Sequence, residues 1–196
     1  MPQPLHDNNH YTYADYLQWP DEPRYELING QAYAMAPAPS PRHQETVGQI
    51  YRQIADALDA SDSGCDVFIA PFDVRLPLHD EADADVSNVV QPDISVFCDP
   101  QCIDEHGARG APDWVVEVIS PGNAAHDQIR KRDLYERSGV QEYWLVHPED
   151  RLVIVYRLVD GEYGKPLVAE LKDSLQAGVL PDVIIDWERV TRKLDR

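Results

Sequence analysis

WVVEVISPG, at residues 114–122, is a run of apolar residues interrupted by a single carboxylate, Glu117. Consecutive apolar positions are typical of a strand whose sheet is covered on both faces. A helical pattern follows at residues 124–138 and ends at Gly139, a residue common after helices. QEYWLVH, at residues 141–147, gives the next apolar strand. Strand, helix and strand in this order predict a right-handed parallel crossover.

A hairpin and a long helix are predicted upstream of this unit. In RYELINGQAYAMA, residues 24–36, two β-prone runs flank Asn29-Gly30, the pair preferred in a type I′ turn. Ser40 and Pro41 then suit an N-cap and a first helical position. Apolar residues recur at helical spacing after Pro41, so this helix is expected to pack one face on a core.

The remaining segments complete one domain of α/β or α+β class, expected at residues 11–196 behind a disordered tail at residues 1–10. The further predicted elements are a short helix within 12–20, strands at 66–76 (broken by Pro71), 90–98 and 151–159, a solvated loop at 79–88, and a last strand or two with a helical turn near the C-terminus. The loop is rich in carboxylates but lacks the glycine and glutamate spacing of a calcium loop.

The composition is that of a globular protein, with 43% hydrophobic and 27% charged residues. No run of about 18 apolar residues occurs, so no membrane span is expected. The N-terminus lacks the basic and apolar segments of a secretory signal. Cys65, Cys98 and Cys102 form an odd set without the second pair that a zinc site needs, which predicts reduced, packed thiols in a cytoplasmic protein.

The charge balance limits what the chain can bind. With 35 acidic and 17 basic residues, the net charge is −18, which opposes association with any polyanion. A dedicated DNA-binding module normally has the reverse balance. Nucleic-acid chemistry would therefore depend on local charge and on a metal.

Two carboxylates stand out against the apolar strands. A buried Glu117 must be protonated, paired or bound to a cation, and an ion pair with an arginine inside the sheet is the structural alternative. Asp93 begins PDISVF, residues 92–97, where an aspartate after proline also suits a strand-entry turn. If the two strands pair, the carboxylates repel by about 4 kcal/mol at about 4 Å and an effective dielectric of about 20. A hard divalent cation removes this repulsion and prefers oxygen ligands.

Lys131 is the third candidate. It lies three, four and seven residues before Leu134, Tyr135 and Ser138, which places it on a partly apolar stripe that faces inward. A buried lysine is readily tuned as an acid or a base. The alternative is a surface pair with Asp127, four residues earlier.

Two further residues are weaker candidates. Glu26 lies in the hairpin, where an alternate position can equally face solvent. His43 lies in the first turn of the long helix, where many histidines only cap or pack. The basic residues around Lys131 could meet phosphates or form a solvated helix face; they are Arg130, Arg132 and Arg137.

Several short motifs in order resemble the Uma-two family of the PD-(D/E)XK, restriction-endonuclease-like superfamily. They are YELINGQ, SPRHQ, QPDISVF, WVVEVISPG, the helix with Lys131 and Tyr135, and GVQEYWLVHP, and together they span about Tyr11 to Trp187.

The resemblance implies a restriction-endonuclease-like core: a mixed central β-sheet flanked by helices, with an N-terminal β-hairpin. It also implies Asp93, Glu117 and the carbonyl of Val118 as ligands of Mg2+ or Mn2+, and a lysine that orients or deprotonates the attacking water. The superfamily pattern has that lysine two residues after the acid, where this chain has Ile119. Within the family pattern the lysine moves to the next helix, which Lys131 fits.

The same resemblance matches Glu26 to an N-terminal glutamate of the pocket and His43 to a histidine of open role. The leading hypothesis is a metal-dependent endonuclease that hydrolyses phosphodiester bonds of DNA, working as a homodimer that cuts both strands. The rival hypothesis, favoured by the net acidity, is an inactive nuclease fold that binds a partner. A glycosidase with two carboxylates explains neither Lys131 nor the motif order.

Overall fold

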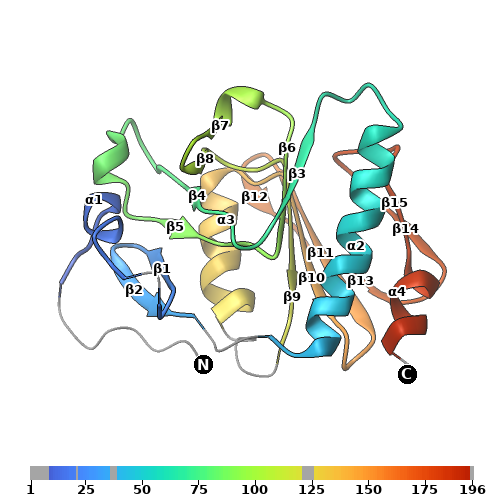
Figure 1. Cartoon of the computed structure of the whole chain (residues 1–196). Helices are drawn as coiled ribbons and strands as arrows, with labels where there is room; N and C mark the ends of the chain where they lie inside the picture. Colours follow the sequence, from blue (N-terminus) through green and yellow to red (C-terminus); the bar gives the residue numbers. More distant parts are fainter. Residues whose placement is uncertain (1–8, 21, 36–38, 121–125, 195–196) are drawn as a thin grey trace.

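The computed structural model describes residues 9–20, 22–35, 39–120 and 126–194, without the side chains of residues 126, 127 and 193. Its central sheet consists of β3 (Asp66–Ile69), β6 (Ile94–Phe97), β9 (Trp114–Val118), β10 (Glu142–His147), β11 (Leu152–Val159), β12 (Glu162–Tyr163) and β13 (Leu167–Glu170). These strands lie in the order β12-β11-β10-β9-β6-β3, with β13 beside β11 (Figure 1). Because β9 and β10 are parallel and the other pairs antiparallel, the sheet is mixed, as the sequence predicts.

The crossover from β9 to β10 contains the predicted helix from residue 126 onward, and residues 124 and 125 lie outside the described residues. It contains a π-helical turn, η3 (His126–Lys131), that continues into α3 (Arg132–Ser138). Gly139 ends the helix in the left-handed conformation, with φ of 90°, which glycine adopts without steric cost. Leu134 and Tyr135 of α3 pack against Val115 on one face of the sheet.

The opposite face of the sheet is covered by α2 (Pro41–Asp59) and α4 (Trp187–Leu194) (Figure 1). Ser40 caps α2 by accepting a hydrogen bond from the backbone N–H of His43, and Pro41 occupies the first helical position, both as predicted. The apolar stripe of α2 is buried in a core cluster with the sheet. A small hairpin, β14 (Ser174–Gln176) with β15 (Ile184–Asp186), lies beside α2.

A second sheet contains the predicted N-terminal hairpin. It has the strand order β2-β1-β5-β4-β8-β7, formed by β1 (Tyr25–Ile28), β2 (Gln31–Ala34), β4 (Val74–Arg75), β5 (Val89–Val90), β7 (Ile103–Asp104) and β8 (Gly107–Arg109). Asn29 and Gly30 both have positive φ, 53° and 72°, as a type I′ turn requires. The short N-terminal helix is α1 (Tyr13–Tyr16), which packs beside this sheet.

The loop at residues 79–88 is held more firmly than predicted. It contains a 3₁₀ turn, η1 (Asp83–Asp85), and Asp83 accepts a hydrogen bond from the buried guanidinium of Arg75 at 2.6 Å. Arg75 also donates a hydrogen bond to Asp104 of β7 at 2.5 Å. The turn η2 (Pro100–Cys102) directly precedes that strand. The carboxylates therefore neutralise a buried arginine.

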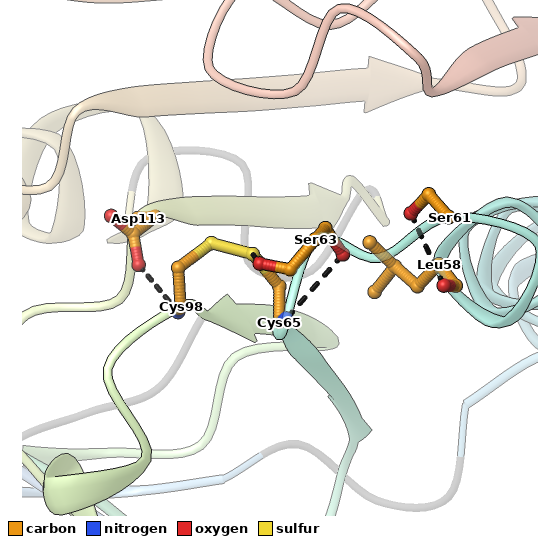
Figure 2. The surroundings of a disulfide bond; sticks show 6 residues. All are labelled: Leu58, Ser61, Ser63, Cys65, Cys98 and Asp113. Carbon is orange, nitrogen blue, oxygen red and sulfur yellow. Dashed lines mark hydrogen bonds between the residues drawn. A yellow bond between two sulfur atoms is a disulfide. The ribbon is translucent and has the colours of Figure 1, made fainter.

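The prediction of three reduced thiols was wrong for two of them, since Cys65 and Cys98 form a disulfide (Figure 2). Antiparallel pairing of β3 with β6 sets Asp66 opposite Phe97, so the next positions along the ladder are the two cysteines. Their Cα atoms lie 4.0 Å apart, because residues opposite one another in such a ladder are close. Cys102 remains a free thiol.

The architecture is that of a mixed α+β fold in which helices flank a mixed central sheet, which confirms the predicted fold class. Most of the tail expected at residues 1–10 lies outside the described residues, which begin at Asn9. Within the described ranges, none of the helices is both long and apolar enough to span a membrane.

Candidate active site

Asp93 and Glu117 meet where β6 and β9 begin to separate. The antiparallel register pairs Ile94 with Val116, so the next positions along the ladder are the two carboxylates. The backbone N–H of Asp93 lies 3.4 Å from Glu117 Oε2, and the N–H of Val118 donates to Asp93 Oδ2 at 2.8 Å. The two strands therefore pair, which is the condition that the sequence argument set for the two carboxylates to lie close together. Asp93 lies just before β6 rather than inside it, and its side chain is 19% exposed.

Lys131 joins this pair from the crossover helix. Its Nζ lies 2.8 Å from Glu117 Oε1 and 2.7 Å from Glu26 Oε1, and the side chain is 4% exposed. The inward-facing stripe is therefore confirmed. Asp127, the alternative partner, has a side chain outside the described residues.

Tyr135 lies one helical turn after Lys131 and donates its hydroxyl proton to the same oxygen, Glu117 Oε1, at 2.9 Å. The sequence placed Tyr135 only on the apolar stripe. The signal that could have identified it is its spacing of four residues from Lys131, which puts both polar ends on one helix face.

Glu26 faces the site from the second sheet. Its side chain is buried, so the solvent-facing alternative was wrong. Glu26 Oε1 accepts the backbone N–H of Gln91 at 2.9 Å as well as the Lys131 ammonium. The hairpin is thereby joined to the segment that leads into Asp93, a contact that sequence spacing did not indicate.

His43 approaches Asp93 from the first turn of α2. Its Nε2 lies 3.2 Å from Asp93 Oδ2, while its buried Nδ1 makes no hydrogen bond within the described residues. Burial lowers the pKa of His43, but the hydrogen bond and charge of Asp93, with the charge of Glu117, outweigh it and raise the pKa above the usual value. A protonated His43 would therefore pair with Asp93.

The electrostatic balance of the site is dominated by the buried Glu117. Burial raises the pKa of its carboxyl to about 7, with Lys131 opposing the shift and Asp93 and Glu26 adding to it. When Glu117 is ionised, the three carboxylates outnumber the two cations, Lys131 and a protonated His43, and this excess of negative charge favours an additional cation.

The donor chemistry suits a hard divalent ion. Asp93 and Glu117 offer carboxylate oxygens, and the backbone of Val118 contacts both Asp93 and His43. Across the described residues, no group of three or more His, Cys, Asp or Glu side chains is placed so that it could hold a metal ion. Two carboxylates are enough for Mg2+, which keeps several of its waters.

The basic residues of the crossover helix do not converge on the carboxylates. Arg132 contacts Asp133 and Glu136, Arg137 bonds Asn29, and the guanidinium of Arg130 lies 5.2 Å from the ring centre of Tyr33. These contacts agree with the alternative in which the arginines belong to the solvated face of the helix rather than to a phosphate site.

Comparison with known proteins points to one family. Residues 13–188 match the family model Uma2, described as "Putative restriction endonuclease". A protein of Synechocystis sp. (strain ATCC 27184 / PCC 6803 / Kazusa), "Uncharacterized protein slr1290", is 30% identical over 135 residues, which cover 67% of this chain and 66% of that protein.

A solved structure has the same fold. The crystal structure of "a putative nuclease belonging to DUF820" from Anabaena variabilis ATCC 29413 matches with a TM-score of 0.73 and 21% identity. The match covers 93% of this chain and 98% of that one. It therefore extends over nearly the whole domain.

Proposed function

Because this chain belongs to the Uma2 family, we propose that it is a metal-dependent endonuclease that hydrolyses phosphodiester bonds of DNA. The observation that carries the proposal is the position of Lys131, whose ammonium bridges Glu117 and Glu26 next to Asp93. A lysine used only to neutralise a buried acid would need one carboxylate. Here three carboxylates and one lysine share a site that opens to solvent at Asp93.

Asp93, Glu117 and the carbonyl of Val118 are the residues that would hold Mg2+ or Mn2+. Such an ion would neutralise charge that develops on the phosphate and lower the pKa of a water. Glu117 is fixed for this task because Lys131 and Tyr135 both donate to its Oε1, which turns Oε2 toward Asp93.

Lys131 acts as the positively charged donor of the site. Its place between Glu26 and Glu117 fixes the ammonium by charge-assisted hydrogen bonds, about twice as strong as neutral ones. From there it orients the attacking water or stabilises negative charge on the phosphoryl oxygens. Glu26 serves as a positioning residue, since it acts through Lys131.

Nicking of supercoiled plasmid in the presence of Mg2+ or Mn2+ tests the proposal. Wild type should cut, chelation by EDTA should stop it, and Glu117→Gln and Lys131→Met should each abolish cutting. Glu170→Gln, which changes an exposed acid on β13, is the matched control and should cut normally. Circular dichroism must show that every variant is folded. A wild-type protein that cuts neither DNA nor RNA, or a Glu117→Gln variant that cuts equally well, would overturn the proposal.

Calorimetric titration with Mn2+ separates the enzyme from an inactive nuclease fold. Binding to wild type that is lost in Asp93→Asn supports the enzyme. Absence of Mn2+ binding by the folded wild type would support the partner-binding alternative, for which the net charge of −18 is the favouring observation.

DNA as the substrate, a cytoplasmic location and a homodimer are the finer parts of the proposal. A homodimer would supply two sites for the two strands. Sedimentation velocity measures the assembly, and parallel assays on double-stranded DNA, single-stranded DNA and RNA define the substrate.

A further inference from the structure

A pocket of about 290 Å³ lies between α1 and the start of β1. Its walls include three aromatic side chains, Tyr16, Trp19 and Tyr25. The ring of Trp19 lies 5.5 Å from that of Tyr16 and 5.2 Å from that of Tyr25, measured between centroids. The walls therefore offer aromatic surface to a flat ligand.

The polar lining of the pocket is fixed by hydrogen bonds. Gln91, which is 8% exposed, donates from Nε2 to Asp73 Oδ1 at 2.7 Å and accepts from Arg24 at 3.1 Å. Tyr16 donates its hydroxyl to the same Asp73 oxygen at 3.0 Å. Burial, with the neighbouring charge of Asp73, raises the pKa of Tyr16, which keeps this hydroxyl a donor. A carboxylate and a guanidinium are thus held at one pocket.

Gln91 connects the pocket to the proposed catalytic residues. Its backbone N–H donates to Glu26 Oε1, the oxygen that also contacts Lys131. Two residues later the chain reaches Asp93, a span of roughly 7 Å for extended backbone. A ligand in the pocket therefore lies next to the site proposed for the scissile phosphate.

We propose that this pocket binds an unpaired nucleobase that carries an exocyclic amino group, adjacent to the phosphodiester to be cut. Aromatic side chains stack on bases, with about 1–3 kcal/mol per base, and the Asp73 carboxylate would accept from the amino group. A base paired within a duplex cannot be stacked in this way, so the strand must be single or the base flipped. The inference rests on the proposed nuclease function and specifies its substrate.

The charge of the chain supports this mode of binding. A net charge of −18 gives little attraction for phosphates, whereas stacking does not depend on the charge of the protein. Bases rather than backbone would thus supply the affinity.

Tryptophan fluorescence tests the inference directly, because Trp19 is the partly exposed one of the four tryptophans. Trp114, Trp144 and Trp187 are each 0% exposed. Metal-free protein is titrated with CMP, dCMP, UMP and ribose 5-phosphate. We expect saturable quenching by CMP or dCMP, weaker binding of UMP, and no quenching by ribose 5-phosphate. The CMP and dCMP arms distinguish RNA from DNA.

Variants then locate the binding. Asp73→Asn should weaken CMP binding by about tenfold and remove most of the preference over UMP, since a charge-assisted hydrogen bond is lost. Tyr25→Ala, followed by calorimetry, should weaken all nucleotides alike, and Glu170→Gln should change nothing. Absence of quenching, equal quenching by ribose 5-phosphate, or equal affinity for CMP and UMP would overturn the inference.

Failure of this inference and failure of the proposed function are distinguishable. Plasmid cleavage without base binding overturns the pocket and leaves the nuclease standing. Base binding by a protein that never cuts overturns the nuclease and leaves the base pocket standing.

Discussion

Two neighbouring strands, β9 and β10, each contain one buried glutamate, Glu117 and Glu142. Glu117 belongs to the candidate active site, whereas Glu142 has structural partners. Glu142 of β10 is 0% exposed and accepts from Trp144 Nε1 at 2.7 Å and from the backbone N–H of Val179 at 2.9 Å, with Arg157 at 3.5 Å. It has the arginine partner that was the alternative for Glu117. The local sequence cannot separate the two glutamates, because each lies in an apolar strand and their partners come from distant segments.

Tyr135→Phe tests whether Tyr135 positions Glu117. Loss of one hydrogen bond to a charged group should reduce the rate of cleavage by about tenfold while the protein stays folded. The effect should fall on kcat rather than KM, because Tyr135 contacts Glu117 and not the substrate. Tyr156→Phe, on the partly buried face of β11, is the control. Equal kcat in wild type and Tyr135→Phe would refute the positioning role.

The raised pKa of Glu117 predicts a pH-dependent stability of the metal-free protein. The folded state holds the proton up to about pH 7, whereas the unfolded carboxyl releases it near its ordinary pKa of 4.5. The folded state therefore binds more protons in this window, and stability falls as pH rises, by a total on the order of 3 kcal/mol. His43, with its raised pKa, adds a loss of the same sign.

Thermal unfolding of wild type and Glu117→Gln between about pH 5 and pH 8 isolates the glutamate, since His43 is present in both. We expect the wild type to lose stability relative to the variant as pH increases. Saturating Mn2+ should reduce the wild-type loss, because the ion favours the ionised carboxyl. Parallel pH profiles without metal would contradict the assignment.

Among the elements, β3 is joined to the central sheet by a covalent contact that the sequence did not predict. The disulfide from Cys65 to Cys98 closes a separation of 33 residues and ties β3 to the end of β6, the strand that follows Asp93. Cys98 is held on the other side by a hydrogen bond from its N–H to Asp113 at 2.7 Å (Figure 2). Disulfides are rare in the cytosol, so the redox state bears on the proposed location.

Reduction of this disulfide should lower the stability of the protein. Chain-entropy arguments give about 3–4 kcal/mol for a loop of this length, which corresponds to a decrease in Tm on the order of 10 °C. Calorimetry with and without dithiothreitol measures the change. A Cys65→Ser, Cys98→Ser double variant should match the reduced protein and be insensitive to dithiothreitol. Identical Tm values in both redox states would show that the bond contributes nothing.

At the scale of the whole molecule, the net charge of −18 predicts an unusual salt dependence. Each neutralised phosphate contributes about −0.9 to the slope of log K against log salt for duplex DNA. With the arginines of the crossover helix engaged in local contacts, the chain should give a slope of magnitude about 3 or less. Fluorescence anisotropy of a labelled oligonucleotide without divalent ions measures the slope. A steep slope, as for basic repressors, would contradict binding through bases.

Much of the fold was predictable, because its signals are local. The Asn29-Gly30 turn, the Ser40-Pro41 helix start and the Gly139 stop depend on backbone preferences that neighbouring residues determine. The parallel crossover followed from element order.

The sequence by itself determined which residues are chemically conspicuous: Asp93 and Glu117 against apolar strands, and Lys131 on an inward stripe. A charge in an apolar context is visible without coordinates because its burial is costly. Only the tertiary structure decided their partners. Tyr135 and His43 reach the carboxylates and Glu26 reaches Lys131, each from a separate element, and Cys65 meets Cys98 across a ladder. Such contacts are fixed by strand register and helix packing, which couple residues far apart in the chain.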